Sequence, residues 1–316
     1  MTMRELAALA GVSVGTVSKA FSGSREVSDA CREKVFRIAR EQGCFEKFDR
    51  TPFGAPVIAV LCPELKSRQY SAQLSLLSGE IRARGGVMIA LDYDFDPLRA
   101  EDLLTYAVRH ARADAIITYH SPASEPPVPT VVMGEHPSLP SVRISRLGAI
   151  KEALSLLASL GHERIGVLSE RLTDGFARTV KECMTELGLP VDDTLFYKSE
   201  ARFEAAGYEG MSALLAREDP PSAVLAAYDN VAIGATRAAE ERGLSIPRDL
   251  SIIGSDDLTE DSYLSSSLSS VSFDNEDLAE VVTDLLFSLL AGEKPHTQTV
   301  KLSARFVARQ SVGKKE

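Results

Sequence analysis

The stretch TMRELAALAGVSVGTVSKAFSGSREVS, residues 2–28, indicates how the chain begins to fold. Thr2 followed by Glu5 has the spacing of a capping box, which predicts that a helix begins directly after Thr2. Gly11 is the residue type that ends a helix in the left-handed conformation without steric cost. Ser13 can then cap a second helix. The stretch therefore predicts two short helices joined by a tight glycine turn.

These helices and the one after them have the order of a helix-turn-helix. The second helix is predicted over about residues 14–21, and Ser28 caps a third over about residues 29–42. In a helix-turn-helix the second helix enters the DNA major groove. Its outward side chains here are small hydroxyls, small apolar groups and one cation, which suit contacts with phosphates and base edges. An ordinary three-helix bundle has the same spacing, so spacing alone leaves both interpretations open. The candidate DNA-contacting residues are Thr2, Ser13, Val14, Gly15, Thr16, Ser18, Lys19 and Ser22.

The amino-acid sequence of residues 2–28 favours the helix-turn-helix over an ordinary three-helix bundle. LAALAGVSVGTVSKAFSG followed by VS resembles the N-terminal headpiece of the LacI/GalR family of bacterial repressors, typically LA-x-x-AGVS-x-x-TVS-R-V-L-N. The resemblance implies a DNA-binding headpiece over residues 1–45. It also implies that Lys19 stands where the family has a base-reading arginine. A lysine can contact guanine but lacks the two-pronged guanidinium.

Charge is distributed unevenly along the chain. The 316 residues carry a net charge of −10, but residues 1–50 hold nine Lys or Arg against seven Asp or Glu. The headpiece is therefore about +2 and the remainder about −12. An acidic body repels the phosphate backbone, so the headpiece is the predicted contact surface for double-stranded DNA. Because one such headpiece is weakly charged, we expect a homodimer that presents two.

Cysteine usage and hydropathy exclude several classes of protein. The four cysteines are scattered without a C-x-x-C pair, which argues against a zinc site and a disulfide framework. The N-terminus lacks the pattern of a signal peptide, and no apolar run is long enough to cross a bilayer. We therefore expect a cytoplasmic protein without membrane contact, metal or cofactor.

Residues 46–56 contain two prolines and a glycine, which predict a shortened linker. The hydropathy pattern changes after this linker. Residues 57–316 alternate apolar strand-like runs with helical patterns, which is typical of parallel sheets covered on both faces. The runs are too many for one sheet. We expect two doubly wound subdomains, about 57–142 plus 274–300 and about 143–273 plus 301–316. A cleft between them, at the carboxyl ends of the strands, would act as a hinged clamp for a small molecule.

The core extends the family resemblance over nearly the whole chain. LASLGHERIGVLS (157–169), AAGYEGMSALL (205–215) and the stretch from AAYDN to GSDD (226–257) resemble family segments, as do residues 111–122, 267–292 and 308–311. The expected fold is thus an all-α helix-turn-helix headpiece followed by an α/β core of the periplasmic-binding-protein type. The expected function is a transcriptional regulator, most simply a repressor, that binds a pseudo-palindromic operator and responds to an effector in the cleft.

The same resemblance points to effector-binding residues. It implies that Asp256, at a strand end, contacts the effector, and that Tyr70 lies where an aromatic ring could stack on a sugar or base. Simple packing of Tyr70 against the linker is the alternative. The candidate effector-binding residues are Tyr70, Arg146, Phe176, Arg178, Tyr228, Asp229, Asp256 and Phe273.

Three of these positions depart from the family pattern. Phe176 replaces the family's sugar-gripping arginine, with Arg178 displaced by two, and Phe273 stands where the family has glutamine. Ser145 and Arg146 replace the usual Asp-Asn pair. Loss of a bidentate arginine disfavours a plain hexose. A sugar-like effector remains one expectation, and a less hydroxylated or anionic one, paired with Arg146 and Arg178, is the other.

The linker departs from the family as well. Most relatives carry an A-R-S-L motif whose helix enters the minor groove, where its leucine wedges between base pairs. This motif is absent here, so we expect a linker without that helix, with Phe48 or Phe53 as a substitute wedge.

Two other classes of protein have an α/β core of this kind, solute-binding proteins and enzymes. A solute-binding protein would share the core fold, but the headpiece string speaks against it. An α/β enzyme would need a nucleophile or phosphate loop, and no G-x-S-x-G elbow or convincing catalytic constellation is present. We therefore expect a protein that is not an enzyme.

Overall fold

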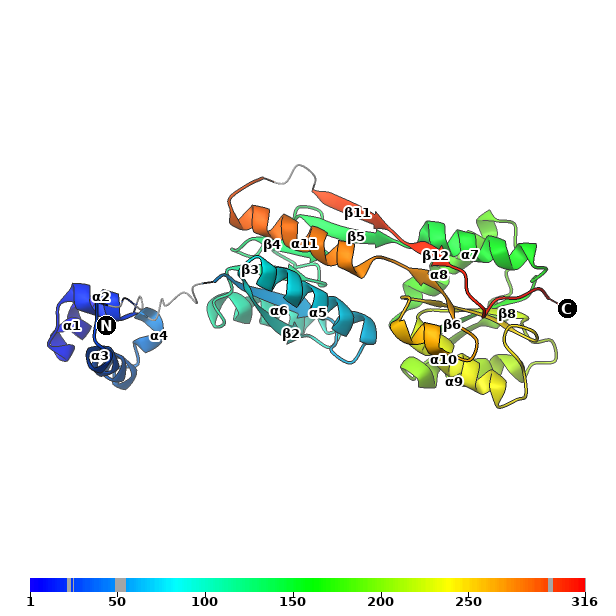
Figure 1. Ribbon diagram of the computed structural model, residues 1–316, viewed down its shortest axis with the longest axis horizontal. Coiled ribbons are helices and arrows are strands. Elements are labelled where there is room, and N and C mark those ends of the chain that lie inside the picture. Colours follow the sequence, from blue (N-terminus) through cyan, green and yellow to red (C-terminus); the bar gives the residue numbers. More distant parts are fainter. Residues whose placement is uncertain (22–23, 25, 49–54, 295–297, 316) are drawn as a thin grey trace.

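The structure is a computed structural model that describes residues 1–21, 24, 26–48, 55–294 and 298–315. Figure 1 shows a small helical headpiece at one end, followed by two α/β bodies. The described part of the headpiece has four helices: α1 (Met3–Ala10), α2 (Val14–Phe21), α3 (Asp29–Glu41) and α4 (Phe45–Phe48). The fold class expected from the sequence is confirmed, both for the helical headpiece and for the α/β core.

The first three helices begin and end where the sequence indicates. The Thr2 hydroxyl accepts from the Glu5 amide and the Glu5 carboxylate accepts from the Thr2 amide, which completes the capping box. Gly11 ends α1 with a φ of 64°, in the left-handed region. The Ser13 hydroxyl accepts from the Thr16 amide at 3.0 Å, and Ser28 caps α3. Gly11 and the Ser13 cap together set the turn between α1 and α2.

A cluster of phenylalanines holds α4 against the rest of the headpiece. The Phe21 ring lies 4.9 Å from Phe36, 5.5 Å from Phe45 and 6.0 Å from Phe48, measured between centroids. Phe48 is buried in this core. The suggestion that Phe48 is a minor-groove wedge is therefore wrong, because its ring is used to pack the headpiece. Phe53, the other suggested wedge, lies outside the described residues.

The first core sheet is wholly parallel, in the order β11-β5-β4-β3-β1-β2. Its strands are β1 (Val57–Cys62), β2 (Val87–Asp92), β3 (Ala115–Thr118), β4 (Thr130–Met133), β5 (Ser141–Ser145) and β11 (Thr299–Ser303). Helices α5 (Arg68–Ala83) and α11 (Asn275–Leu290) cover one face, and α6 (Pro97–Arg109) covers the other. Alternate residues of β1 therefore pack on opposite helices, which explains its continuous apolar run.

The second core sheet has the order β12-β10-β9-β8-β6-β7, and only β12 runs antiparallel to its neighbour. Its strands are β6 (Ile165–Glu170), β7 (Phe196–Ser199), β8 (Ala223–Ala226), β9 (Ser251–Ser255), β10 (Ser269–Ser272) and β12 (Arg305–Val307). Its helices are α7 (Leu147–Ser159), α8 (Asp174–Glu186), α9 (Phe203–Leu215) and α10 (Asp229–Glu240), with single turns η1 (Asp193–Leu195) and η2 (Thr259–Tyr263).

The chain crosses between the two sheets three times, after β5, after β10 and after β11. The first sheet includes β5 to Ser145 and β11 to Ser303, a few residues beyond the boundaries near 142 and 300 suggested by the sequence. The crossings therefore run through Arg146, Phe273 and Ala304. Three adjacent connections of this kind form a hinge between the two bodies.

Within the described part of the chain, no helix has the length and apolar character needed to span a membrane.

Candidate functional site

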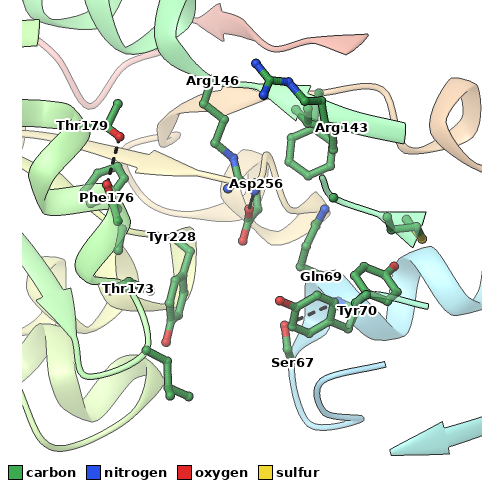
Figure 2. Close-up of a pocket in the computed structure, with 18 of the residues that line it drawn as sticks. Ser67, Gln69, Tyr70, Arg143, Arg146, Thr173, Phe176, Thr179, Tyr228 and Asp256 are labelled. Atoms are coloured by element: carbon green, nitrogen blue, oxygen red, sulfur yellow. Dashed lines mark hydrogen bonds and ion pairs between the residues drawn. The ribbon is translucent and has the colours of Figure 1, made fainter. Parts of the chain in front are cut away.

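A cavity of about 790 Å³ lies between the two sheets. Its lining comes from loops that follow the carboxyl ends of strands in both bodies, including Glu64 after β1, Tyr119 after β3 and Asp256 after β9. This is the place where open α/β sheets bind ligands. The two bodies therefore form opposite walls of one cleft, part of which is shown in Figure 2.

The cleft gathers six of the eight residues that the sequence suggested for it. These are Tyr70, Arg146, Phe176, Tyr228, Asp256 and Phe273. Tyr70 comes from α5 in the first body, and Figure 2 shows it facing Tyr228 of the second body across open space. Arg146 and Phe273 lie on two of the three hinge connections. A molecule bound here would therefore touch both walls and the hinge.

Tyr70 belongs to an aromatic wall of the cleft, and residues 49–54 of the linker lie outside the described part of the chain. Its ring lies 5.2 Å from Tyr119 and 6.4 Å from Phe95, in edge-on arrangements. Burial raises the pKa of the Tyr70 phenol to about 12, with the charge of Asp256 adding to the shift. The hydroxyl therefore stays protonated at neutral pH and can donate a hydrogen bond.

Arg146 connects the acidic end of β9 with the hinge. Its Nη2 lies 3.5 Å from Asp256 Oδ1, and its guanidinium carbon lies 5.2 Å from the centre of the Phe273 ring. Burial raises the pKa of the Asp256 carboxyl to about 8; the Arg146 charge opposes this shift and Asp229 adds to it. Asp256 also has a φ of 116°, a strained conformation for a residue with a side chain.

Two residues suggested by the sequence do not line the cavity. Asp229 is 0 % exposed, and its carboxylate accepts from the Leu258 amide at 3.0 Å and the Ser270 hydroxyl at 2.8 Å. Asp229 therefore holds the start of α10 against β10 and the loop that follows β9. Arg178 is exposed on α8, whose cavity face carries Phe176 and Thr179 instead. A residue two positions from Phe176 points to another side of a helix.

An ion-pair network formed by Arg202, Glu64 and Glu170 spans the cleft and was not predicted from the sequence. Arg202, just before α9, binds Glu64 of the opposite body with Nη2 2.6 Å from Oε1 and Nη1 3.3 Å from Oε2. Its Nε also binds Glu170 at the end of β6. Glu170 further accepts from the Phe203 amide at 3.0 Å. The only available sequence signal was that each of these charges stands just beyond a strand-like run.

Two further polar groups of the cleft have no hydrogen-bond partner among the described residues. Gln69 and Gln73 both donate to Asn275 Oδ1 at 3.0 Å, which leaves Gln69 Oε1 buried and unpartnered. The Tyr228 hydroxyl is also buried without a well-directed hydrogen bond, although it lies beside Glu170 and Arg202. Burial, followed by the Glu170 charge, raises the pKa of Tyr228 well above its ordinary value.

The headpiece presents the other set of predicted residues. Val14 is 42 % exposed at the start of α2, and Gly15, Ser18 and Lys19 are exposed along it. Thr16 is half-buried and shares a hydrogen bond with Ser13 at 2.9 Å. The Thr2 and Ser13 hydroxyls also cap helices, and Ser22 lies outside the described residues.

Lys19 has a partner that sequence reasoning did not anticipate. Its ammonium group binds the Glu26 carboxylate, and this contact lowers the pKa of Glu26. Both side chains are at least half exposed, so water and salt weaken the pair. A phosphate or base edge can therefore compete with Glu26 for Lys19.

Comparison with known proteins covers both parts of the chain. The family described as bacterial regulatory proteins, lacI family, matches residues 2–43, and the periplasmic binding protein-like domain matches residues 154–312. The ribose operon repressor of Haemophilus influenzae is 28 % identical over 98 % of both chains. The transcriptional regulator AglR of Rhizobium meliloti is 31 % identical over 82 % of this chain and 78 % of its own.

A solved structure agrees with the fold of the entire chain. The lac repressor dimer bound to operator and the anti-inducer ONPF superposes with a TM-score of 0.75, at 21 % identity and over 99 % of both chains. The named relatives are regulators rather than enzymes, in agreement with the interpretation of the sequence. The chain belongs to the lacI family of bacterial regulatory proteins.

Proposed function

We propose that this chain is a repressor that binds a pseudo-palindromic operator as a homodimer, and that a small molecule in the cleft changes its affinity for DNA. The observation that carries the proposal is the exposed polar face of α2, held by capped helix ends on a headpiece with a net charge of about +2, in contrast with the net acidic remainder of the chain. The structure named for a lac repressor dimer on its operator supports the same mode of assembly.

We infer different roles for the exposed residues of α2. Val14 and Gly15, at its start, allow a close approach to base edges, where a valine methyl can contact a thymine methyl. Ser13, Thr16 and Ser18 supply hydroxyls for phosphates, and Thr2 supports the start of α1. Lys19 exchanges its contact with Glu26 for one with DNA. Two headpieces in successive major grooves then read an inverted repeat.

The phenylalanine cluster supports a readout centred on the major groove. Phe45 and Phe48 of α4 pack on Phe21 inside the headpiece, so neither ring is available to unstack base pairs. A relative that kinks DNA with a wedge derives part of its specificity from the deformation. This chain instead would depend on contacts from α2 and on the spacing of its two headpieces.

The position of the cleft supports coupling between effector and DNA. Arg146 and Phe273 line the cavity and also lie on the connections between the two bodies. A ligand that contacts them favours one angle between the bodies over another. Because the headpiece is joined to the first body, a change in this angle alters the distance between two headpieces of a dimer. Ligand and DNA affinity are then linked by a coupling free energy.

The test is selection of bound duplexes from a random-sequence pool with the full chain. The expected result is enrichment of an inverted repeat whose half-sites lie about one helical turn apart, or a multiple of that distance. Enrichment of a single unrepeated half-site would contradict the dimer, and failure to enrich any sequence would contradict operator binding.

A further inference from the structure

The charges of the cleft identify a class of ligand for it. We infer that the molecule held in the cleft is a small cation, a protonated amine on a hydroxylated or aromatic body, rather than an anion or a neutral sugar. This inference rests on the proposed function, because it concerns the same effector cleft.

The lining carries more negative than positive groups. Its carboxylates are Glu64, Glu135, Glu170, Glu182 and Asp256, and its guanidinium groups are Arg143, Arg146 and Arg202. Burial keeps Asp256 largely protonated at neutral pH, so the four glutamates against three guanidinium groups leave a surplus of one negative charge, and a cation beside Asp256 would favour its ionised form as well. A cavity with this balance attracts cations and repels anions.

Each guanidinium group of the lining is already bound by a carboxylate of the chain. Arg143 pairs with Glu135, Arg146 faces Asp256 at 3.5 Å, and Arg202 binds both Glu64 and Glu170. An anionic ligand at Arg143 or Arg202 would have to displace a carboxylate, and one at Arg146 would keep Asp256 in its neutral form. The arginine that the sequence suggested for an anion, Arg178, lies outside the lining. The expectation of an anionic effector therefore loses its physical support.

The contact around Arg202 leaves a negative charge without compensation. Glu170 is 0 % exposed and Glu64 is 6 % exposed, yet the two share one guanidinium group. A buried charge without an opposite charge is strongly unfavourable. The Arg202 guanidinium lies 4.6 Å from the centre of the Phe203 ring and 5.5 Å from that of Phe95. The walls beside this charge are therefore aromatic faces, which attract a second cation as well.

Asp256 offers a further acceptor for a cation. Among the described residues its carboxyl has one long contact, with Arg146, in a site where burial disfavours its charge. An ammonium group donates three hydrogen bonds and accepts none, so it suits an acceptor of this kind.

A neutral sugar meets only part of these requirements. Its hydroxyls could donate to Asp256, and its ring could stack on Tyr70. The uncompensated charge of the buried Glu64 and Glu170 would then remain beneath an uncharged ligand. A cation satisfies the same acceptors and also compensates the charge, so the amine is the better complement.

The experiment uses ligand pairs that differ in one charge, titrated calorimetrically into the full chain at neutral pH. Glucosamine is compared with glucose and N-acetylglucosamine, and 2-phenylethylamine with 2-phenylethanol. Glucose 6-phosphate serves as the anion. The expected result is that the amine of at least one set binds tenfold or more tightly than its uncharged partners, while the phosphate binds no better than glucose.

Variants place the preference in the cleft. Glu64→Gln removes one negative charge from the lining, and Asp256→Asn removes the carboxyl that a bound amine would ionise, so the preference for the amine should shrink at least threefold in each. Asp102→Asn removes the same charge from an exposed position of α6 and should leave the preference unchanged. Glu64 also supports the fold through its contact with Arg202. If Glu64→Gln does not fold, the result with Asp256→Asn alone tests the inference.

Tighter binding of an uncharged or anionic probe overturns the inference, and so does the absence of binding by both amines. An amine preference that Asp256→Asn leaves unchanged also overturns it. DNA binding by the same preparation is measured separately. Failure of the amines while DNA is bound would overturn the ligand class alone, and amine binding without DNA binding would overturn the proposed function alone.

Discussion

Arg202 binds Glu64 across the cleft, with Nη2 2.6 Å from Oε1, and so joins the two bodies of the core through the site that would hold the ligand. A second ion pair joins the two bodies, with Arg68 Nη1 3.1 Å from Glu260 Oε1. The Arg202–Glu64 pair also lines the cavity. We therefore expect that a ligand which disturbs this pair changes the angle between the bodies.

Removal of the Arg202 guanidinium should destabilise the core. Arg202→Met leaves Glu64 and Glu170 buried without an opposite charge, so we expect a loss of about 3 kcal/mol in the free energy of unfolding. The midpoint of urea unfolding measures it. Lys181→Met breaks an exposed pair with Asp193 and should cost less than about 1 kcal/mol. Equal losses in the two variants would contradict the structural role of Arg202.

Stability should fall as the pH rises, because of buried carboxyls near η2. Burial raises the pKa of Asp261 to about 9, and Asp229 and Asp257 add to the shift while Arg309 opposes it. The folded state thus holds this proton more tightly than the unfolded state. Its stabilising contribution is complete at acid pH, declines as the pH rises above the unfolded pKa, and is lost once the pH passes about 9.

Asp261→Asn tests this pH dependence. The asparagine cannot ionise, so its free energy of unfolding should change less between pH 6 and pH 9. The difference in slope should be at most about 1.4 kcal/mol per pH unit, the value for one proton. Urea midpoints at several pH values measure it. Parallel pH profiles for the two proteins would show that Asp261 is not the titrating group.

Binding of an amine should release protons from the cleft. At pH 7 a carboxyl with a pKa of about 8 is roughly nine-tenths protonated, and Arg146, Asp229 and Tyr70 are the groups that act on Asp256. A cation beside Asp256 favours its ionised form. Calorimetry at pH 7 in two buffers with different ionisation enthalpies should therefore show proton release from the unmodified chain and little from Asp256→Asn. Equal release by the two proteins would point to another group.

The contact between α9 and α10 should not tolerate a larger residue. A Cβ on Gly207 would lie 1.8 Å from the Val231 carbonyl oxygen, so the helix backbones would have to separate. We expect Gly207→Ala to lower stability by about 3 kcal/mol or more. Gly148→Ala, in α7 where a Cβ meets nothing within 4 Å, should instead raise stability by about 0.5–1 kcal/mol. Thermal unfolding of both variants measures the contrast.

Local signals in the sequence were enough for the fold. The capping box at Thr2, the glycine turn at Gly11 and the alternation of strands with helices each depend on neighbouring residues, and the structure retains them. The hinge position of Arg146 also follows from such signals, because it marks a break in the alternation.

The site could be predicted only in part, since its contacts join distant segments. The pairing of Glu64 with Arg202 spans 138 residues, and no local pattern connects them. Asp229 and Arg178 lie outside the lining for a different reason. Family position placed them near the cleft, but the first turn of α10 directs Asp229 inward and α8 directs Arg178 to solvent. Helical spacing gives the relative directions of side chains, but which face of a helix meets the cleft depends on packing that sequence position does not give.

The central claim is that α2 of the headpiece binds DNA, and a pair of charge reversals tests it most directly. Lys19→Glu and Lys181→Glu change the net charge of the full chain equally, one on α2 and the other on α8. Fluorescence anisotropy with the selected operator, at increasing salt, measures binding by both variants. We predict that Lys181→Glu binds like the unmodified chain, losing about a hundredfold or more in affinity between 0.05 and 0.2 M salt. Lys19→Glu should lose specific binding already at the lowest salt. Equal affinity of the two variants would contradict the claim.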